Sequence, residues 1–218
     1  MTCQAHCCAI DAQFDRRVAQ RDLENYRRKG PSPSTRQLVS TIRQAGIADA
    51  HLLDVGGGVG AIAHELLAAG AGHATIVDGS AAYLAAARDE AERRQCSERL
   101  KVLTGDFTAL AHDVDIADVV TLDKVVCCYP DMERLLDASA SHAARLLGIV
   151  YPRDAWWVRL VSKAINATFA LRRTAFRTYI FSNIAIDNAI RRAGFSLRYE
   201  RRGYPWVVAL YERSSVAQ

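Results

Sequence analysis

The chain has 218 residues, of which 50% are hydrophobic and 24% charged, and its formal net charge is +4. This length suits one α/β domain with additions, and the apolar content supports a full core and excludes wholesale disorder. No apolar run reaches membrane-spanning length, and the N-terminus lacks a basic-then-apolar leader, so we expect a cytoplasmic protein.

The charge is unevenly distributed along the chain. Residues 1–150 hold 16 Lys and Arg against 20 Asp and Glu, whereas residues 151–218 hold 12 against 4. The basic last third is either a place where an anionic substrate or partner binds or a solvated basic face. The cysteines include the adjacent pairs 7–8 and 127–128, a pattern unsuited to a disulfide framework, so we expect reduced thiols.

The N-terminal segment is predicted to be irregular over residues 1–12 and helical afterwards. Its first residues include the soft-metal ligands Cys3, His6, Cys7 and Cys8. Their spacing matches no zinc module, so no metal site is assigned. A charged helix is predicted from Phe14 to Lys29 and ends at the Gly-Pro-Ser-Pro sequence of residues 30–33. A second helix, capped by Ser34 or Thr35, should follow as far as Gly46.

The most informative stretch is residues 51–60, His-Leu-Leu-Asp-Val-Gly-Gly-Gly-Val-Gly. An apolar run leads into Asp54, glycines follow, and apolar residues then recur at helical spacing. The pattern predicts a buried strand, a tight glycine turn and a helix. Glycine permits the sharp turn and lets a ligand lie against bare backbone at the start of a helix.

Two classes of ligand use such a turn. The spacing Gly56-x-Gly58-x-x-Ala61, with Asp78 about twenty residues further on, satisfies the dinucleotide fingerprint. However, Asp54 stands two residues before the first glycine, where its carboxylate would repel a pyrophosphate and could hold an ammonium group. We therefore favour a ligand with an amino-acid moiety, and a nicotinamide dinucleotide remains the alternative.

Acids also follow the next two predicted strands. The strand over residues 74–77 ends at Asp78-Gly79-Ser80, and Ser80 should cap a helix over residues 83–94. An acid at this strand end can accept hydrogen bonds from both ribose hydroxyls of an adenosine. The strand over residues 100–103 is followed by Gly105-Asp106-Phe107.

The fourth predicted strand covers residues 117–123, and residues 124–130 cross from it to a helix over residues 132–145. Ligands of open α/β sheets bind beyond the carboxyl ends of the strands. The side chains expected beside a substrate are therefore Asp123, Lys124, Cys127, Cys128 and Tyr129. A fifth strand is predicted over residues 147–151.

The stretch after the fifth strand departs from a minimal α/β fold. Residues 156–169 form a basic amphipathic helix with an apolar stripe, which can dock on the core, lie on a membrane or cover an active site. Its place after strand five favours a substrate-covering insertion over about residues 153–181, with docking on the core as the alternative. A helix from Ser182 to Gly194 and a hairpin of strands over residues 195–199 and 206–211 complete the chain.

The glycine turn with Asp54, together with Gly105-Asp106-Phe107, resembles the motifs of class I S-adenosylmethionine-dependent methyltransferases. The resemblance implies a three-layer Rossmann-like α/β fold whose mostly parallel seven-stranded sheet ends in an antiparallel hairpin. It implies a helical segment over residues 1–48 that covers the cofactor, and a methyltransferase domain over residues 49–218. S-adenosylmethionine is then the expected cofactor, with Asp54 near its methionine moiety and Asp106 near its adenine amino group.

The resemblance sets the list of candidate site residues. The expected cofactor contacts are Tyr26, Asp54, Gly56, Gly57, Gly58, Gly60, Asp78, Gly79, Ser80, Asp106, Phe107, Asp123 and Lys124. The candidate catalytic residues are Asp123 and Tyr129.

A narrower resemblance concerns the acceptor. The sequence of residues 118–130, Asp-Val-Val-Thr-Leu-Asp-Lys-Val-Val-Cys-Cys-Tyr-Pro, is similar to that of magnesium-protoporphyrin O-methyltransferases, which methylate a propionate carboxylate. We therefore expect direct O-methylation of a small anionic or aromatic molecule. An ionised carboxylate needs no general base, whereas a phenol can use a histidine or a carboxylate to remove its proton. The alternatives are a thiol or metalloid methyltransferase that uses the cysteines, and an NAD-dependent oxidoreductase; nucleic acid is not expected, since no RNA-binding module is visible.

Overall fold

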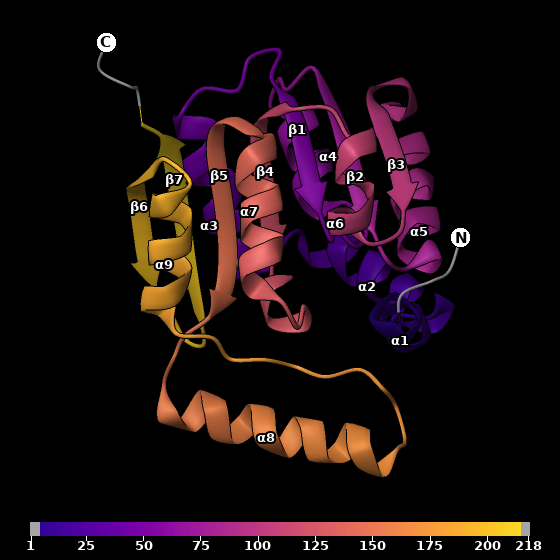
Figure 1. Cartoon of the computed structure of the whole chain (residues 1–218). Helices are drawn as coiled ribbons and strands as arrows, with labels where there is room; N and C mark the ends of the chain where they lie inside the picture. Colours follow the sequence, from indigo (N-terminus) through magenta and orange to yellow (C-terminus); the bar gives the residue numbers. More distant parts are fainter. Residues whose placement is uncertain (1–4, 215–218) are drawn as a thin grey trace.

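The protein is built on a seven-stranded sheet with helices on both faces (Figure 1). The structure is a computed structural model that describes residues 5–214, with side chains from residue 8 onward. The strand order is β3-β2-β1-β4-β5-β7-β6, and only β7 runs antiparallel to its neighbours. The strands are β1 (His51–Val55), β2 (His73–Asp78), β3 (Leu100–Thr104), β4 (Ala117–Asp123), β5 (Ala143–Pro152), β6 (Phe195–Arg202) and β7 (Trp206–Arg213). The predicted fold class is therefore confirmed.

Two hydrophobic cores lie on opposite faces of the sheet. The helices are α1 (Ala5–Gln13), α2 (Arg16–Lys29), α3 (Pro33–Gln44), α4 (Ala61–Ala68), α5 (Ala81–Arg93), α6 (Phe107–Leu110), α7 (Met132–His142), α8 (Trp156–Leu171) and α9 (Asn183–Arg192). Because successive strand residues point to opposite faces, Leu52 and Val119 pack with α3, α4 and α5, whereas Leu53 and Val120 pack with α7 and α9. A central sheet buried on both faces explains the unbroken apolar runs in the sequence.

The N-terminal segment differs from the prediction at two places. Residues predicted to be irregular form α1, and the next helix begins only at Arg16, where Asp15 accepts a hydrogen bond from the Val18 amide. Helix α3 is capped by Ser32, two residues earlier than predicted, and has Pro33 as its first residue. Proline suits that position because the first amide of a helix needs no intrahelical acceptor.

Strand boundaries near the end of the sheet were also misjudged. The helix predicted to reach residue 145 ends at His142, and β5 begins at Ala143. The added strand residues are held by neighbours that local sequence does not reveal: Ala143 pairs with Ala117, and Leu146 pairs with both Val119 and Glu212. Strand pairing across the sheet therefore overrides the helical pattern of this stretch.

Helix α8 stands apart from the sheet and is joined to it by a return segment, residues 172–182 (Figure 1). Only Val158 and Ser162 of this helix are buried. The interpretation in which its apolar stripe packs on the core is therefore wrong. Within residues 5–214, no helix has the length and apolar character needed to cross a membrane.

Candidate active site

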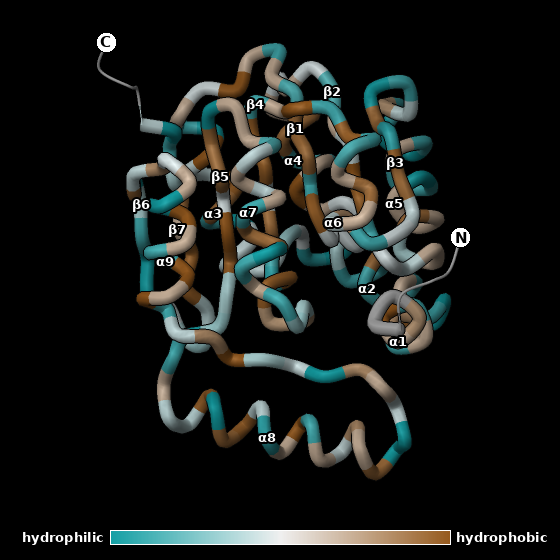
Figure 2. Tube along the Cα trace, in the orientation of Figure 1, coloured by the Kyte–Doolittle hydropathy of each residue, from teal (hydrophilic) through white to brown (hydrophobic). Residues whose placement is uncertain are grey.

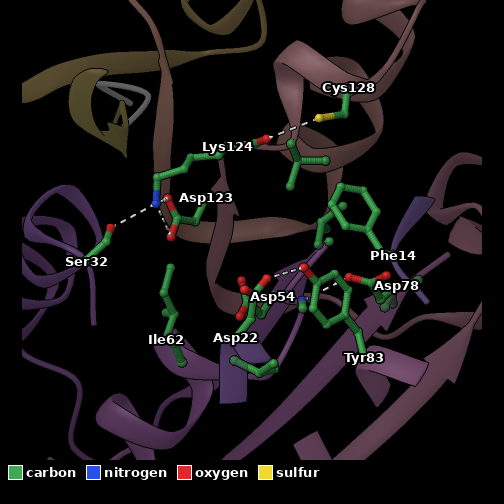
Figure 3. Close-up of a pocket in the computed structure, with 18 of the residues that line it drawn as sticks. Phe14, Asp22, Ser32, Asp54, Ile62, Asp78, Tyr83, Asp123, Lys124 and Cys128 are labelled. Atoms are coloured by element: carbon green, nitrogen blue, oxygen red, sulfur yellow. Dashed lines mark hydrogen bonds and ion pairs between the residues drawn. The ribbon is translucent and has the colours of Figure 1, made fainter. Parts of the chain in front are cut away.

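A cavity of about 760 Å³ lies at the carboxyl ends of β1 to β4 (Figure 3). Its wall combines the glycine turn, the acids that follow the strands and parts of α1, α2 and the loop before α3. The predicted site residues that line it are Tyr26, Asp54, Gly56, Gly57, Gly58, Asp78, Gly79, Asp106, Phe107, Asp123, Lys124 and Tyr129. Gly60 and Ser80 do not line it, since they act as the N-caps of α4 and α5.

The glycines of the turn are required for different physical reasons. Gly56 and Gly58 have φ values of +64° and +56°, which side-chain-bearing residues rarely adopt. A Cβ atom at Gly57 would lie 2.6 Å from the Asp54 carboxylate, whereas one at Gly58 would meet nothing within 4 Å. Gly57 thus permits close packing, and Gly58 leaves an open face of backbone toward the cavity.

Asp78 fixes the glycine turn to the end of β2. Its two carboxylate oxygens accept hydrogen bonds from the amides of Gly58, at 2.9 Å, and Ser80, at 2.8 Å. Burial raises the pKa of Asp78, and these two amides oppose that shift by favouring the charged form. The carboxylate therefore has a structural partner in the turn as well as a place on the cavity wall.

Asp54 is the least satisfied charged group of the site. Its Oδ1 accepts a hydrogen bond of 2.7 Å from Thr121, but its buried Oδ2 has no hydrogen-bond partner within residues 8–214. Burial is the main cause that raises the pKa of Asp54 to about 7, and the Thr121 hydroxyl opposes the shift. A cationic ligand group would supply the partner that this oxygen lacks.

Asp106 and Tyr129 form a buried pair on the next part of the wall. The Tyr129 hydroxyl lies 3.1 Å from each carboxylate oxygen of Asp106 and 2.7 Å from the Thr108 hydroxyl. Burial raises the pKa of Tyr129 to about 12, so the phenol stays protonated at neutral pH. These contacts suit a residue that positions Asp106, and the predicted catalytic role of Tyr129 stays a prediction.

At the end of β4, Asp123 and Lys124 form an ion pair. Two hydroxyl residues that the sequence analysis did not select as site residues, Ser32 and Thr35, contact this pair. The Lys124 ammonium lies 3.0 Å from the hydroxyls of Ser32 and Thr35 and 3.1 Å from Asp123 Oδ1. Thr35 also donates a hydrogen bond to Asp123 Oδ2, and the Trp206 ring lies 5.7 Å from the ammonium. No local pattern marks Ser32 and Thr35, because the chain fold alone brings them across to β4.

The N-terminal helices form the outer side of the cavity. The Phe14 ring lies 5.3 Å from that of Tyr83, and the Phe14 carbonyl accepts a 2.7 Å hydrogen bond from Ser80. Tyr83 in turn donates to Asp22 of α2 at 2.7 Å. Tyr26 lines the cavity while its hydroxyl points to Glu65, at 2.8 Å. Sequence reasoning found Tyr26 but missed Phe14, Asp22 and Tyr83, whose roles depend on how α2 packs on α5.

The cysteines divide into two groups. The sulfurs of Cys127 and Cys128 lie 3.8 Å apart, and Cys128 lines the cavity. Cys3 and the side chain of Cys7 lie outside the described residues, and Cys8 is exposed. Among the side chains that the structure describes, no cluster of three or more potential metal ligands occurs.

The insertion touches the cavity wall from outside. None of the described residues 153–181 lines the cavity itself. The return segment nevertheless packs beside it: the Tyr179 amide donates to the Cys127 carbonyl at 2.8 Å, and the rings of Phe176 and Phe14 lie 5.5 Å apart. The helix is therefore attached to the site through its return segment.

Comparison with known proteins places this geometry in a class. Residues 52–147 match the methyltransferase domain family. A curated relative, the ubiquinone/menaquinone biosynthesis C-methyltransferase UbiE of Ruegeria sp. (strain TM1040), is 42% identical over 72 residues, which cover 33% of this chain and only 29% of the relative.

Solved structures resemble the chain over nearly its whole length. Magnesium protoporphyrin IX methyltransferase from Synechocystis PCC 6803 with bound SAM superposes with a TM-score of 0.70 at 18% identity, covering 98% of this chain and 100% of that one. An O-methyltransferase family protein from Burkholderia thailandensis gives a TM-score of 0.69 at 19% identity, covering 94% and 62% of the two chains. At these identities the likeness establishes the fold.

Residues 52–147 thus match a methyltransferase domain, and the sheet order and the glycine turn agree with the fold of the class I S-adenosylmethionine-dependent methyltransferases whose motifs the sequence resembles. The unpartnered Asp54 oxygen and the open face of Gly58 fit S-adenosylmethionine, the cofactor that the sequence motifs lead us to expect. The alternative of a nicotinamide-dependent oxidoreductase is thereby set aside.

Proposed function

We propose that the protein transfers a methyl group directly from S-adenosylmethionine to an oxygen of a small anionic acceptor, a carboxylate attached to an aromatic or apolar body. The observation that carries this proposal is the distribution of charge around the cavity. Its lining cations are Lys29, Arg36 and Lys124, which come from the end of α2, from α3 and from the residue after β4. In Figure 3, Lys124 and Ser32 lie on one side and Asp78 and Tyr83 on the other.

The acidic side fits the cofactor. We assign the ammonium group of the methionine moiety to Asp54, the ribose hydroxyls to Asp78, and the adenine amino group to Asp106 with Phe107 against the ring. The positive charge on the sulfonium makes its methyl group electrophilic when the cofactor is bound. Residues 1–48 are then a segment that covers the cofactor, because Phe14 and Tyr26 line the outer side of the same cavity.

The basic side fits an anionic acceptor. Lys124 can bind a carboxylate, and the hydroxyl of Ser32, which already lies 3.0 Å from its ammonium group, can donate to the same anion. No histidine is among the described residues that line the cavity, and the high pKa of Tyr129 makes it a poor base. An acceptor that is already ionised needs neither, so positioning and exclusion of water are sufficient tasks for the protein.

The experiment is methyl transfer from S-adenosylmethionine carrying a radiolabelled methyl group to matched aromatic acceptors. A free carboxylic acid, its amide and a phenol with the same ring are compared. We expect label only in the acid product, and we expect mild alkali to release it as methanol because methyl esters hydrolyse whereas ethers and C-methyl groups do not. An alkali-stable product would overturn carboxylate methylation and point to a phenol or a carbon acceptor.

A matched pair of lysine variants locates the acceptor site. Lys124→Met should raise KM for the acid by about tenfold, the usual scale for one charged hydrogen bond, and leave cofactor affinity within about twofold. Lys101→Met, at an exposed position on β3, is the control and should change neither quantity. If Lys124→Met weakens cofactor binding and leaves the acceptor KM unchanged, Lys124 is a cofactor residue.

A further inference from the structure

The outer face of α8, defined here as Trp156, Leu160, Val161, Ile165 and Leu171, is exposed to solvent. Trp156 is 78%, Leu160 60% and Leu171 86% exposed. Eight large hydrophobic residues are exposed in the part of the chain that the structure describes, and five of them form this face. A sixth, Tyr204, stacks on Trp157 of the same helix at 4.2 Å. Exposed apolar surface is therefore concentrated on one element.

The face that α8 turns toward the body is mixed: Val158 is buried, Phe169 packs on Phe176, and the polar residues Ser162 and Asn166 make its hydrogen bonds. Ser162 is buried and its hydroxyl lies 2.9 Å from that of Thr178, and Asn166 makes two hydrogen bonds with the Thr178 backbone, at 2.7 and 2.8 Å. A surface helix of a globular protein normally buries its apolar face. Here the return segment is hydrogen-bonded to Ser162 and Asn166, and the five residues of the outer face stay exposed. Figure 2 shows that α8, which stands apart from the sheet, contains several hydrophobic stretches.

Positive charge surrounds this apolar face. Residues 153–177 contain six Lys and Arg and one Asp, a net charge of +5, whereas the rest of the chain sums to −1. No carboxylate side chain occurs from residue 155 to residue 186. The one acid of the segment, Asp154, already pairs with Arg159 at 2.6 Å. The binding partner of α8 must therefore combine an apolar phase with negative charge.

We propose that α8 is an interfacial helix that lies on an anionic lipid surface, with its outer face between the headgroups and the acyl chains. A helix with apolar residues on one side and Lys and Arg beside them has the composition of such interfacial helices. Anionic headgroups satisfy the positive charge, and aromatic rings such as that of Trp156 suit the boundary region. A second copy of the chain is a poorer partner, because it would bring two segments of charge +5 together.

Vesicle sedimentation tests the proposal with the full-length protein. We expect the protein to bind vesicles that contain phosphatidylglycerol, to bind pure phosphatidylcholine vesicles about tenfold more weakly, and to lose most binding in high salt. The double variant Leu160→Glu with Leu171→Glu should reduce binding to the anionic vesicles by about tenfold or more, since it removes two apolar anchors and adds negative charge.

The control replaces an equally exposed apolar residue elsewhere. Ile116, 65% exposed at the opposite end of the sheet, is changed to Glu, and binding to vesicles should be unaltered. The variants should keep the parent's unfolding temperature and cofactor affinity, because all three positions are exposed and none lines the cavity. Cofactor binding thus reports on the methyltransferase site separately from lipid binding.

Two outcomes would overturn the proposal. One is that the protein sediments with neither kind of vesicle. The other is that ultracentrifugation without lipid shows a dimer that Leu160→Glu dissociates, which would assign the outer face to a second copy of the chain.

Discussion

The cavity edge of the sheet and helix α8 place their side chains in opposite ways. At the cavity, charged groups are withdrawn from solvent: Asp54, Asp78 and Asp106 are each less than 10% exposed. On α8, large apolar groups such as Leu160 are left in solvent. Both arrangements cost free energy in the isolated chain, by several kcal/mol for a poorly compensated buried charge and by about 1.5–3 kcal/mol for a Leu kept exposed. In each region, a bound partner would offset this cost: a cationic ligand group at the carboxylates, and an apolar phase at α8.

The two regions differ in how many partners the chain itself provides for the buried acids and for the exposed apolar side chains. Asp78 has two backbone amides and Asp106 has the Tyr129 hydroxyl, so of these three acids Asp54 alone keeps an oxygen without a hydrogen-bond partner in the described residues. Within the part of the chain that the structure describes, the outer face of α8 stays exposed, from 40% at Ile165 to 86% at Leu171. The chain therefore provides most of the partners of the cavity acids, whereas the outer face of α8 lacks cover until a partner binds.

The largest effect should come from Asp78→Ala. The change removes the proposed ribose acceptor and also leaves the amides of Gly58 and Ser80 without their carboxylate, so the turn loses its tie to β2. We expect cofactor affinity to fall about 100-fold, or about 3 kcal/mol, as measured by calorimetry.

Asp118→Ala is the matched control for that change. Asp118 accepts a 2.8 Å hydrogen bond from the His51 amide at the amino ends of β4 and β1, away from the cavity. Its loss should reduce stability and leave cofactor affinity unaltered. Equal affinity losses in both variants would mean that the effect of Asp78→Ala is general destabilisation.

A pH dependence should follow from Asp54. Burial raises its pKa from about 3.9 to about 7 in the folded protein without ligand, so the folded state binds more protons than the unfolded state between these values. The free energy of unfolding of the ligand-free protein should therefore fall as the pH rises from about 4 through 7. Since an ammonium group needs the ionised carboxylate, cofactor affinity should rise with pH up to about 7 and then level.

Below pH 7 the change in affinity should approach tenfold per pH unit, with a proton released on binding. Calorimetry in buffers of different ionisation enthalpy measures that proton. Asp54→Asn, which cannot ionise, should bind weakly at every pH and show no such dependence. A parent protein whose affinity is flat over about pH 5 to 8 would remove the ammonium contact from Asp54.

A smaller effect is expected for Tyr129→Phe. The variant loses the hydroxyl that contacts Asp106 and Thr108, so KM for S-adenosylmethionine should rise about three- to tenfold, or about 1 kcal/mol, at unchanged kcat. This split is the mark of a positioning residue. If kcat falls by about 100-fold or more at saturating cofactor, Tyr129 is catalytic, as the sequence suggested.

The smallest effect should come from the adjacent cysteines. Replacing Cys127 and Cys128 by serine preserves size and polarity at the cavity wall, so methyl transfer to a carboxylate should stay within about twofold of the parent. Loss of turnover in this variant, together with a thiophilic metal or metalloid found in the parent by elemental analysis, would instead favour the thiol or metalloid methyltransferase.

How much the sequence revealed depends on how local the signal was. The strand, glycine turn and helix of residues 51–68 follow from apolar periodicity and glycine chemistry, and β4 was predicted at its observed bounds, Ala117–Asp123. Ser80 was recognised as an N-cap and Ser182 as the start of a helix, because a helix start depends on the next few residues only. The cap of α3 was misassigned, since Ser32, Ser34 and Thr35 offer three hydroxyls to the same helix end.

The sequence by itself determined the alternation of strands and helices, the acids that end the strands and, through the motifs that these form, the cofactor. Only the tertiary structure decided which groups meet across the chain: Ser32 and Thr35 with Lys124, Tyr129 with Asp106, and Ser162 and Asn166 of α8 with Thr178. The physical reason is the range of the interactions. Backbone propensities and caps act over a few residues, whereas the partner of a buried charge or an amphipathic face can lie a hundred residues away.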